Sequence, residues 1–169
     1  MTFPFTDAKY WIDRLGLKPH PEGGWFKEIY RSDEIITASA LPARYTQPRN
    51  FCTSIYFLLE HPDFSAFHKL RSDELWHFYA GSPLSVYRID NNGEFKNDIL
   101  LSGTEGLPFI SIRRNTWFAA EVFTPGSYSL IGCTVAPGFD FSDFTLADRA
   151  ELSKAFPQHS QLIERLIRQ

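Results

Sequence analysis

The chain has 169 residues, of which 43% are hydrophobic and 22% are charged, so it can bury a substantial core. Its formal net charge of −3 at pH 7 provides no basic field, which argues against nucleic acid as a general partner. Aromatic residues make up 16% of the chain, and such residues favour strands and large inner surfaces. We therefore expect a β-rich globular protein.

The first predicted element is a helix over residues 6–17. Thr6 or Asp7 can cap its start, and Gly16 can end it. Its apolar side chains recur at helical spacing: Tyr10, Trp11, Ile12 and Leu15. A turn-rich stretch follows, after which residues 25–31 alternate like a strand. Residues 36–50 lack periodicity and predict an irregular excursion.

From residue 51 onward, strand-like segments alternate with turns. The segments cover residues 51–60, 65–72, 74–81, 83–90, 95–102, 109–123 and 127–136. The turn at Asn92-Gly93 is typical of a hairpin. Short strands at this spacing predict a sandwich or barrel. Two short helices, over residues 143–156 and 157–169, complete one domain that spans residues 1–169.

The N-terminal sequence has no basic segment followed by an apolar one, so we expect no signal peptide. The longest apolar runs fall well below membrane-spanning length, so we expect no membrane partner and a cytoplasmic protein. Cys52 and Cys133 each lie inside a strand-like stretch, where buried free thiols are expected.

Residues 67–81, with the sequence FHKLRSDELWHFYAG, contain the strongest candidate site. His68, Glu74 and His77 lie on neighbouring strands or on the turn between them. Imidazole and carboxylate groups bind divalent metals, and they also form general acid–base pairs. Glu74 and His77 differ by three positions, so a regular strand directs them to opposite faces unless a bulge intervenes. Spacing alone leaves both chemistries open.

Several other side chains are candidates for a ligand pocket: Glu22, Trp25, Tyr56, Trp76 and Trp117. The tryptophans could form an aromatic wall for a flat or sugar-like ligand, or they could simply pack in the barrel. Tyr56 could supply a phenol as an acid. The loop HPEGGWF either carries Glu22 to the barrel mouth or forms only a tight turn with positive φ at a glycine.

Two aspartates, Asp140 and Asp143, lie in the segment APGFDFSDF after the last predicted strand. Aspartate side chains in loops commonly accept hydrogen bonds from nearby backbone N–H groups. We expect these two residues to hold the loop in place rather than to take part in chemistry.

The stretch at residues 67–81 is similar to the first cupin motif, which reads HxH, three or four residues, Glu, six residues, Gly. His68, Glu74 and Gly81 match it with the spacing kept, whereas Leu70 occupies the second His position. In the second cupin motif, Phe118 stands where the fourth ligand His would be. Two of the four metal-ligand positions therefore carry side chains that cannot bind a metal.

The chain as a whole resembles the cupin-5 (DUF985) group of uncharacterised cupin-like proteins. The resemblance rests on HPEGGWFKEIYRS, TSIYFLL, SAFHKLRSDELWHFYAG, PLSVYRI, WFAAE and LIGCTVAPGFDFSDF. It implies a mainly β double-stranded β-helix, the cupin or jelly-roll barrel, with its core at roughly residues 25–146. It also implies a ligand cavity and commonly a homodimer, but no particular reaction. Phe109, the run at 113–115 and Phe118 depart from the group, which suggests a different ligand or a modified activity.

Three hypotheses of function follow. In the first, the cavity binds a small polar molecule without a cofactor, in the manner of a metal-independent epimerase or isomerase. His68 would then be the base and Glu74 its orienter, and the ligand-binding residues would be Glu22, Trp25, Tyr56, His77 and Trp117. In the second, His68, Glu74 and His77 bind a divalent metal, as in a dioxygenase or metal isomerase. In the third, the protein is a non-catalytic small-molecule sensor. A homodimer formed through residues 25–31 is expected as well.

Overall fold

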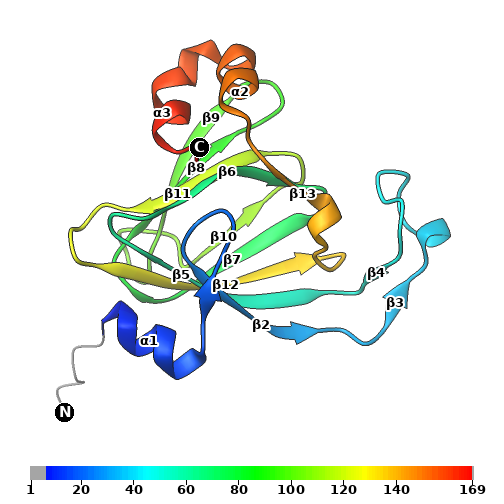
Figure 1. Cartoon of the computed structure of the whole chain (residues 1–169), viewed down its shortest axis with the longest axis horizontal. Coiled ribbons are helices and arrows are strands. Elements are labelled where there is room, and N and C mark those ends of the chain that lie inside the picture. The colour runs from blue at the N-terminus through cyan, green and yellow to red at the C-terminus, as the bar shows by residue number, and fades with distance from the viewer. Residues whose placement is uncertain (1–6, 169) are drawn as a thin grey trace.

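Two antiparallel β-sheets face each other in the computed structural model, which describes residues 7–168 (Figure 1). One sheet has six strands in the order β1-β2-β5-β12-β7-β10, and the other has five in the order β13-β6-β11-β8-β9. The strands are β1 (Lys18–Pro19), β2 (Trp25–Arg31), β3 (Ile35–Ile36), β4 (Arg49–Asn50), β5 (Thr53–Glu60), β6 (Phe64–Leu70), β7 (Asp73–Gly81), β8 (Leu84–Ile89), β9 (Phe95–Leu100), β10 (Phe109–Ile112), β11 (Trp117–Val122), β12 (Tyr128–Ala136) and β13 (Phe144–Leu146). This architecture confirms the mainly β double-stranded β-helix.

The main core lies between the two sheets because alternate residues of each strand turn inward. It includes Phe57 of β5, Trp76 of β7, Phe118 of β11 and Ile131 of β12, all at most 1% exposed. Burial of such side chains is the dominant favourable contribution to folding. The outer faces of the sheets are covered separately. A second cluster packs α1 against the six-stranded sheet, and a third packs the C-terminal helices against the five-stranded sheet.

The helices are α1 (Ala8–Leu15), α2 (Arg149–Ala155) and α3 (Ser160–Arg165), with short 3-10 turns η1 (Ala38–Ala40), η2 (Phe141–Asp143) and η3 (Pro157–His159). Asp7 caps α1 by accepting from the Tyr10 N–H, and Gly16 ends the helix in the left-handed conformation, as predicted. Thr6, the alternative cap, lies outside the described residues. None of the helices described for residues 7–168 combines the length and apolar character needed to cross a bilayer.

The prediction of a helix from residue 143 onward was wrong at its start. Phe144–Leu146 form β13, which pairs with β6, and Asp148 caps a helix that begins only at Arg149. The backbone of this segment completes the edge of the five-stranded sheet, so tertiary pairing overrides the local helical pattern. This detail matters because β13 places Phe144 beside the site described below.

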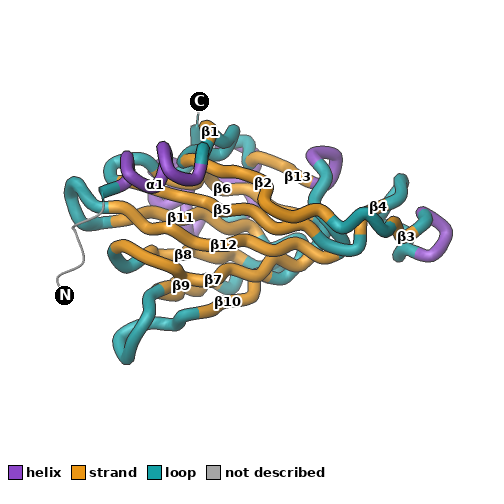
Figure 2. The backbone as a smooth tube through the Cα atoms, turned by 90° about the horizontal axis from the view of Figure 1, so that it is seen from below, coloured by secondary structure: helices purple, strands orange, loops and turns teal. Residues whose placement is uncertain are grey.

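The irregular excursion predicted for residues 36–50 is present and spans residues 32–52. Figure 1 and Figure 2 show it projecting to one side of the two main sheets, with β3 and β4 paired along its length. Only these two short strands and η1 give it regular structure. Arg49, on β4, is nevertheless almost completely buried against the barrel.

Candidate functional site

A cavity of about 270 Å³ opens between the two sheets at one end of the main core. Its wall comes from β2, β5, β6, β7 and β12, together with the loops at 20–22 and 139–144. Core aromatics such as Trp76 and Phe57 form part of it, so the cavity is an extension of the apolar interior. Into this apolar setting project three almost fully buried ionisable side chains, Glu22, His68 and Glu74.

His68 lies in the middle of β6, where it faces inward opposite Phe118 of β11 and Leu146 of β13. Its ring centroid is 4.0 Å from that of Phe118, and the residue as a whole is only 2% exposed. The Nδ1 atom lies 2.7 Å from the carbonyl oxygen of Ala66, which can only accept. Nδ1 therefore carries a proton, and Nε2 is the atom left to face the cavity.

Glu22 enters the cavity from the loop between β1 and β2. Gly23 has φ of +114°, and a Cβ there would lie 2.1 Å from the carbonyl oxygen of Phe64. Only glycine allows this close approach, which lets the loop lie against β6 and accept from the Ala66 N–H at 2.9 Å through the Glu22 carbonyl. The tight turn and the inward glutamate, weighed as alternatives from the sequence, are thus two aspects of one loop.

The Glu22 carboxylate contacts two imidazoles and a hydroxyl. Its Oε2 atom is 3.2 Å from His68 Nε2 and 3.5 Å from His20 Nδ1, and its Oε1 accepts from Ser65 Oγ at 2.8 Å. The Glu22 backbone N–H donates to His20 Nδ1, which makes that nitrogen an acceptor. Contact between Glu22 Oε2 and His68 Nε2 requires a proton on one of the two atoms, so the pair holds one proton in common.

Burial disfavours charge on each member of this pair. It lowers the pKa of His68 to about 4, although the bond to the Ala66 carbonyl opposes the shift. It also raises the pKa of Glu22, although His20, Ser65 and Arg168 oppose the shift. Both directions favour the uncharged form of each group, so they draw the shared proton toward Glu22 rather than toward an imidazolium at His68. Such a pair titrates as a unit rather than as two independent groups.

Glu74 reaches the same cavity from β7, opposite Val135 of β12 and Ile112 of β10. Burial, reinforced by the charge of Glu22, raises its pKa to about 8. Its Oε2 atom has no hydrogen-bond partner, and neither does the indole N–H of Trp76, which lies nearby without hydrogen-bond geometry. Buried polar atoms are normally paired, so these two atoms point to a ligand or water in the cavity.

The carboxylate that contacts His68 is Glu22, although the sequence suggested Glu74 for that position. Two residues of β7 separate Glu74 from His77, and the regular alternation of the strand puts them on opposite faces, as parity indicated. The His77 ring lies 4.9 Å from that of Phe109, and His77 is absent from the cavity wall. His68, Glu74 and His77 therefore do not converge on one point.

The other aromatic candidates also lie outside the cavity wall. Tyr56 and Trp25 contribute to the cluster under α1, and Trp25 Nε1 donates to Glu60 at 3.2 Å. Trp117 packs on the outer face of the five-stranded sheet, with Lys69 Nζ 4.3 Å from its ring centroid. Of the three tryptophans proposed as an aromatic wall, only Trp76 lines the cavity.

Sequence reasoning missed several residues of the wall, chiefly His20 and the aromatic side chains of the 139–144 loop. The signal for His20 was its position two residues before Glu22 in a loop already suspected of reaching the barrel mouth. The signal for the loop was its spacing of aromatics, Phe139, Phe141 and Phe144, around two aspartates. Neither pattern is specific without the fold that brings both loops to the same opening.

The residues at the cupin ligand positions do not fit a four-ligand metal centre. Leu70 lines the cavity with an alkyl side chain, and the Phe118 ring packs directly against His68. Within residues 7–168 there is no group of three or more His, Cys, Asp or Glu side chains arranged to hold a metal ion.

Comparison with known proteins supports this description of the fold. The family model described as Cupin superfamily (DUF985) matches residues 9–147. The chain belongs to this family. Protein SO0799 from Shewanella oneidensis is 34% identical, with a TM-score of 0.86 over 97% of this chain and 99% of that one. A hypothetical protein from Leishmania major is 29% identical, with a TM-score of 0.86 over 97% and 100% of the two chains.

More distant cupins share the fold alone. Oxalate decarboxylase from Bacillus subtilis is 12% identical to this Cupin_5 chain, with a TM-score of 0.53 over 88% of this chain and 36% of that one. At that identity its reaction carries no weight for this chain. No curated protein matches the sequence.

Proposed function

We propose that this Cupin_5 protein binds a small polar molecule in the cavity between its sheets and transfers protons to and from it without a metal. The reaction class would be epimerisation or isomerisation at a carbon beside a carbonyl group. The observation that carries the proposal is the convergence of Glu22, His68 and Glu74 on one apolar cavity, with one carboxylate oxygen left unpaired. Ionisable groups with strongly shifted pKa values in a cleft are characteristic of active sites.

The two sides of the site would have different roles. Glu74 has a pKa of about 8, so it is mostly protonated at pH 7 and can donate a proton to a developing oxyanion. The Glu22–His68 pair would take the proton from the carbon beside the carbonyl and later return one to it, while Glu74 protonates the carbonyl oxygen and then recovers its proton. Glu22 takes the orienting position beside the imidazole, since its Oε2 lies 3.2 Å from His68 Nε2.

Deuterium incorporation tests this proposal. The protein is incubated in D₂O with a panel of carbonyl-containing metabolites, and each compound is followed by proton NMR for loss of the signal beside its carbonyl group. We expect exchange with at least one compound, and we expect His68→Gln to abolish it. The matched control is His77→Gln, because His77 lies outside the cavity wall.

The rival hypotheses give different results in the same preparation. A non-catalytic sensor would bind a compound, seen as a rise in melting temperature, without any exchange. A metal-dependent enzyme would contain about one metal ion per chain by plasma mass spectrometry, and that ion would be lost in His68→Gln. Either result would contradict metal-free proton transfer.

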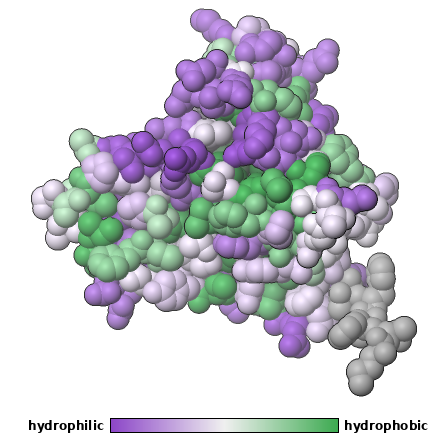
Figure 3. Space-filling view, turned by 180° about the vertical axis from the view of Figure 1, so that it is seen from behind, coloured by the Kyte–Doolittle hydropathy of each residue, from purple (hydrophilic) through white to green (hydrophobic). Residues whose placement is uncertain are grey.

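We also propose that two copies associate through the open edge of β2. In the described part of the chain, β1 pairs only with Phe26 and Trp25, which leaves the rest of that edge of β2 without a strand. Exposed apolar side chains gather there and on the adjoining excursion: Ile29, Tyr30, Ile35 and Phe51. Figure 3, which shows the side opposite to that of Figure 1, has polar residues gathered over the C-terminal helices.

Sedimentation velocity at micromolar concentration tests this association. We expect a dimer for the wild type and a monomer for Ile29→Lys, because a charge on the contact face would have to be desolvated. A wild-type monomer would contradict the proposal.

A further inference from the structure

The cavity has a pronounced imbalance of charge that indicates what kind of molecule it accepts. We infer that its ligand is a small organic cation, an amine on an apolar body, rather than an anion. This inference rests on the proposed function only in placing the ligand in the same cavity. The charges and the aromatic rings of the cavity wall carry the rest of the inference.

Acidic side chains outnumber basic ones around the cavity. Four carboxylates line it, namely Glu22, Glu28, Glu74 and Asp140, against the single guanidinium of Arg31. Glu22 and Glu74 are 6% and 7% exposed, so they lie in the interior, where burial favours the protonated form of each carboxyl group. A bound cation would offset the cost of ionising them, so that Glu74 releases its proton on binding, whereas a bound anion would oppose that ionisation.

Arg31 offers no free donor to an anionic ligand. Its Nε and Nη2 atoms donate to the Glu28 carboxylate at 2.9 and 2.8 Å, and its Nη1 donates to Asn50 Oδ1 at 2.8 Å. Both terminal nitrogens also donate to the carbonyl oxygen of Phe139 at 3.2–3.3 Å. All five N–H groups are thereby used, and the charge of Arg31 is already balanced by Glu28.

The remaining wall suits an ammonium group with an apolar body. It carries six aromatic rings: Phe26, Phe57, Trp76, Phe139, Phe141 and Phe144. Aromatic faces attract organic cations, and the attraction is greatest where water is excluded. Glu74 Oε2 is buried and has no partner, so it is the natural acceptor for an ammonium N–H.

Three probes of nearly equal size separate the possible charges of the ligand: benzylamine, benzyl alcohol and benzoate. Binding is measured at pH 7.5 by isothermal titration calorimetry and, independently, by quenching of tryptophan fluorescence. We expect benzylamine to bind about tenfold or more tightly than either of the others, from the ion pair and the cation–π contacts together. Equal binding of the amine and the alcohol, stronger binding of benzoate, or no binding of any probe at 10 mM would each overturn the inference.

Two variants locate the effect. Glu74→Gln keeps the shape of the side chain but cannot ionise when the amine binds, so the preference for benzylamine over benzyl alcohol should fall to about threefold or less. His77→Gln, on the other face of β7, should leave the preference unchanged. Should Glu74→Gln fail to fold, the wild-type ranking of the three probes still decides the question.

The outcomes separate this inference from the proposed function. Selective amine binding without deuterium exchange in any amine-containing carbonyl compound would leave the ligand class standing and remove the proton-transfer chemistry. Deuterium exchange confined to anionic or uncharged metabolites, without selective amine binding, would leave the chemistry standing and remove the ligand class.

Discussion

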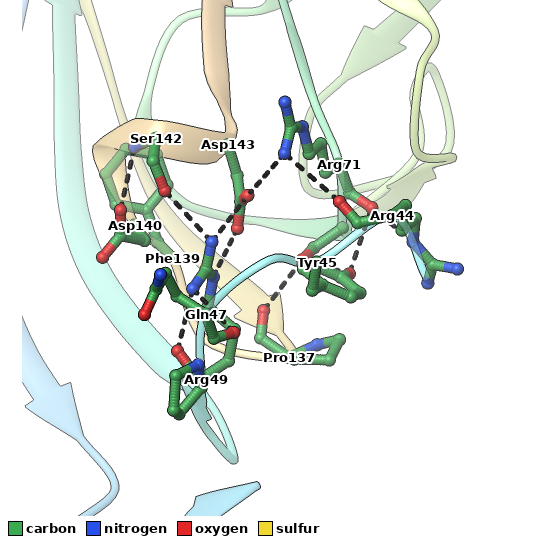
Figure 4. Close-up of polar contacts among 12 residues, drawn as sticks. Arg44, Tyr45, Gln47, Arg49, Arg71, Pro137, Phe139, Asp140, Ser142 and Asp143 are labelled. Carbon is green, nitrogen blue, oxygen red and sulfur yellow. Dashed lines mark hydrogen bonds and ion pairs between the residues drawn. The ribbon is translucent and has the colours of Figure 1, made fainter. Parts of the chain in front are cut away.

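Arg49 and Asp143 form a buried ion pair whose hydrogen-bonding groups are well matched, whereas the buried ionisable groups of the cavity are not. The guanidinium donates to the two Asp143 oxygens at 2.6 and 2.8 Å, and also to Ser142 and to the carbonyls of Gln47 and Pro48 (Figure 4). In the cavity, by contrast, Glu74 Oε2 has no partner, and Glu22 and His68 hold one proton between them.

The difference indicates separate purposes for the two groups. A fully paired buried charge fixes backbone, and here it links the excursion at β4 to η2, next to the loop that carries Phe139 and Phe141 to the cavity. A partly paired buried charge costs stability in the free protein and gains a partner only when a ligand arrives. The Arg49–Asp143 pair therefore keeps the loop of the cavity wall in place, whereas the ionisable groups inside the cavity are available for chemistry.

The largest expected effect comes from breaking the paired group. Asp143→Asn should lower the free energy of unfolding by about 3–5 kcal/mol, because it leaves the Arg49 charge buried without a counter-charge. Urea unfolding followed by tryptophan fluorescence measures it. Asp13→Asn, which removes the exposed partner of Lys9, is the matched control and should have no measurable effect.

The double variant Arg49→Met/Asp143→Leu sharpens this prediction. Replacing both charges with apolar side chains should recover most of the stability that the single variant loses. A single variant as stable as the wild type would show that the pair does not hold the excursion to the barrel.

Glu74 should show the opposite behaviour, since removing its charge stabilises the protein. The pKa is raised in the folded state to about 8, so the folded protein binds more protons than the unfolded chain from about pH 4.5 to 8. The contribution of Glu74 to the free energy of unfolding is therefore fully present below about pH 4.5, and it is lost as the pH rises to about 8. Glu74→Gln should raise the free energy of unfolding on the order of 2–4 kcal/mol at pH 8.5 and leave it little changed at pH 4.5. An equal effect at both pH values would contradict the prediction.

His68 should give a smaller dependence in the acid range. Its folded pKa of about 4 lies below the unfolded value near 6.5, so the unfolded chain binds more protons between these values. Stability therefore falls as the pH drops from 6.5 to 4, and we expect a loss on the order of 1–2 kcal/mol between pH 8 and 5. His68→Gln should flatten this part of the profile. If the free energy of unfolding of the variant fell with pH as steeply as that of the wild type, groups other than His68 would be responsible for the dependence.

The fold could be predicted more fully than the site. Strand alternation, turn residues and family motifs were enough for the barrel, since each is a local pattern that burial of one face enforces. They also placed His68 and Glu74 inside it. They could not pair His68 with Glu22, because that contact joins residues 46 positions apart through a loop whose course depends on Gly23 and β6.

Asp140 and Asp143 illustrate the same limit within a single loop. Asp140 accepts from the backbone N–H of Ser142, as expected of a loop aspartate. For Asp143, backbone capping was expected, yet its carboxylate is paired with Arg49, 94 positions away in sequence. Local turn chemistry is readable from neighbouring residues, whereas a buried ion pair depends on which loops the tertiary fold brings together.

The smallest effect is expected at His77, which tests whether the face of a strand or the type of residue decides function. His77 and Glu74 belong to the same strand, yet the His77 ring lies against Phe109 on the outer face. His77→Gln should therefore change the free energy of unfolding by less than about 0.5–1 kcal/mol, from lost ring contact alone. Melting temperature and benzylamine affinity, measured beside those of His68→Gln, check it. A loss of benzylamine binding in His77→Gln would mean that the outer face of β7 takes part in the site, for example at a contact between two copies.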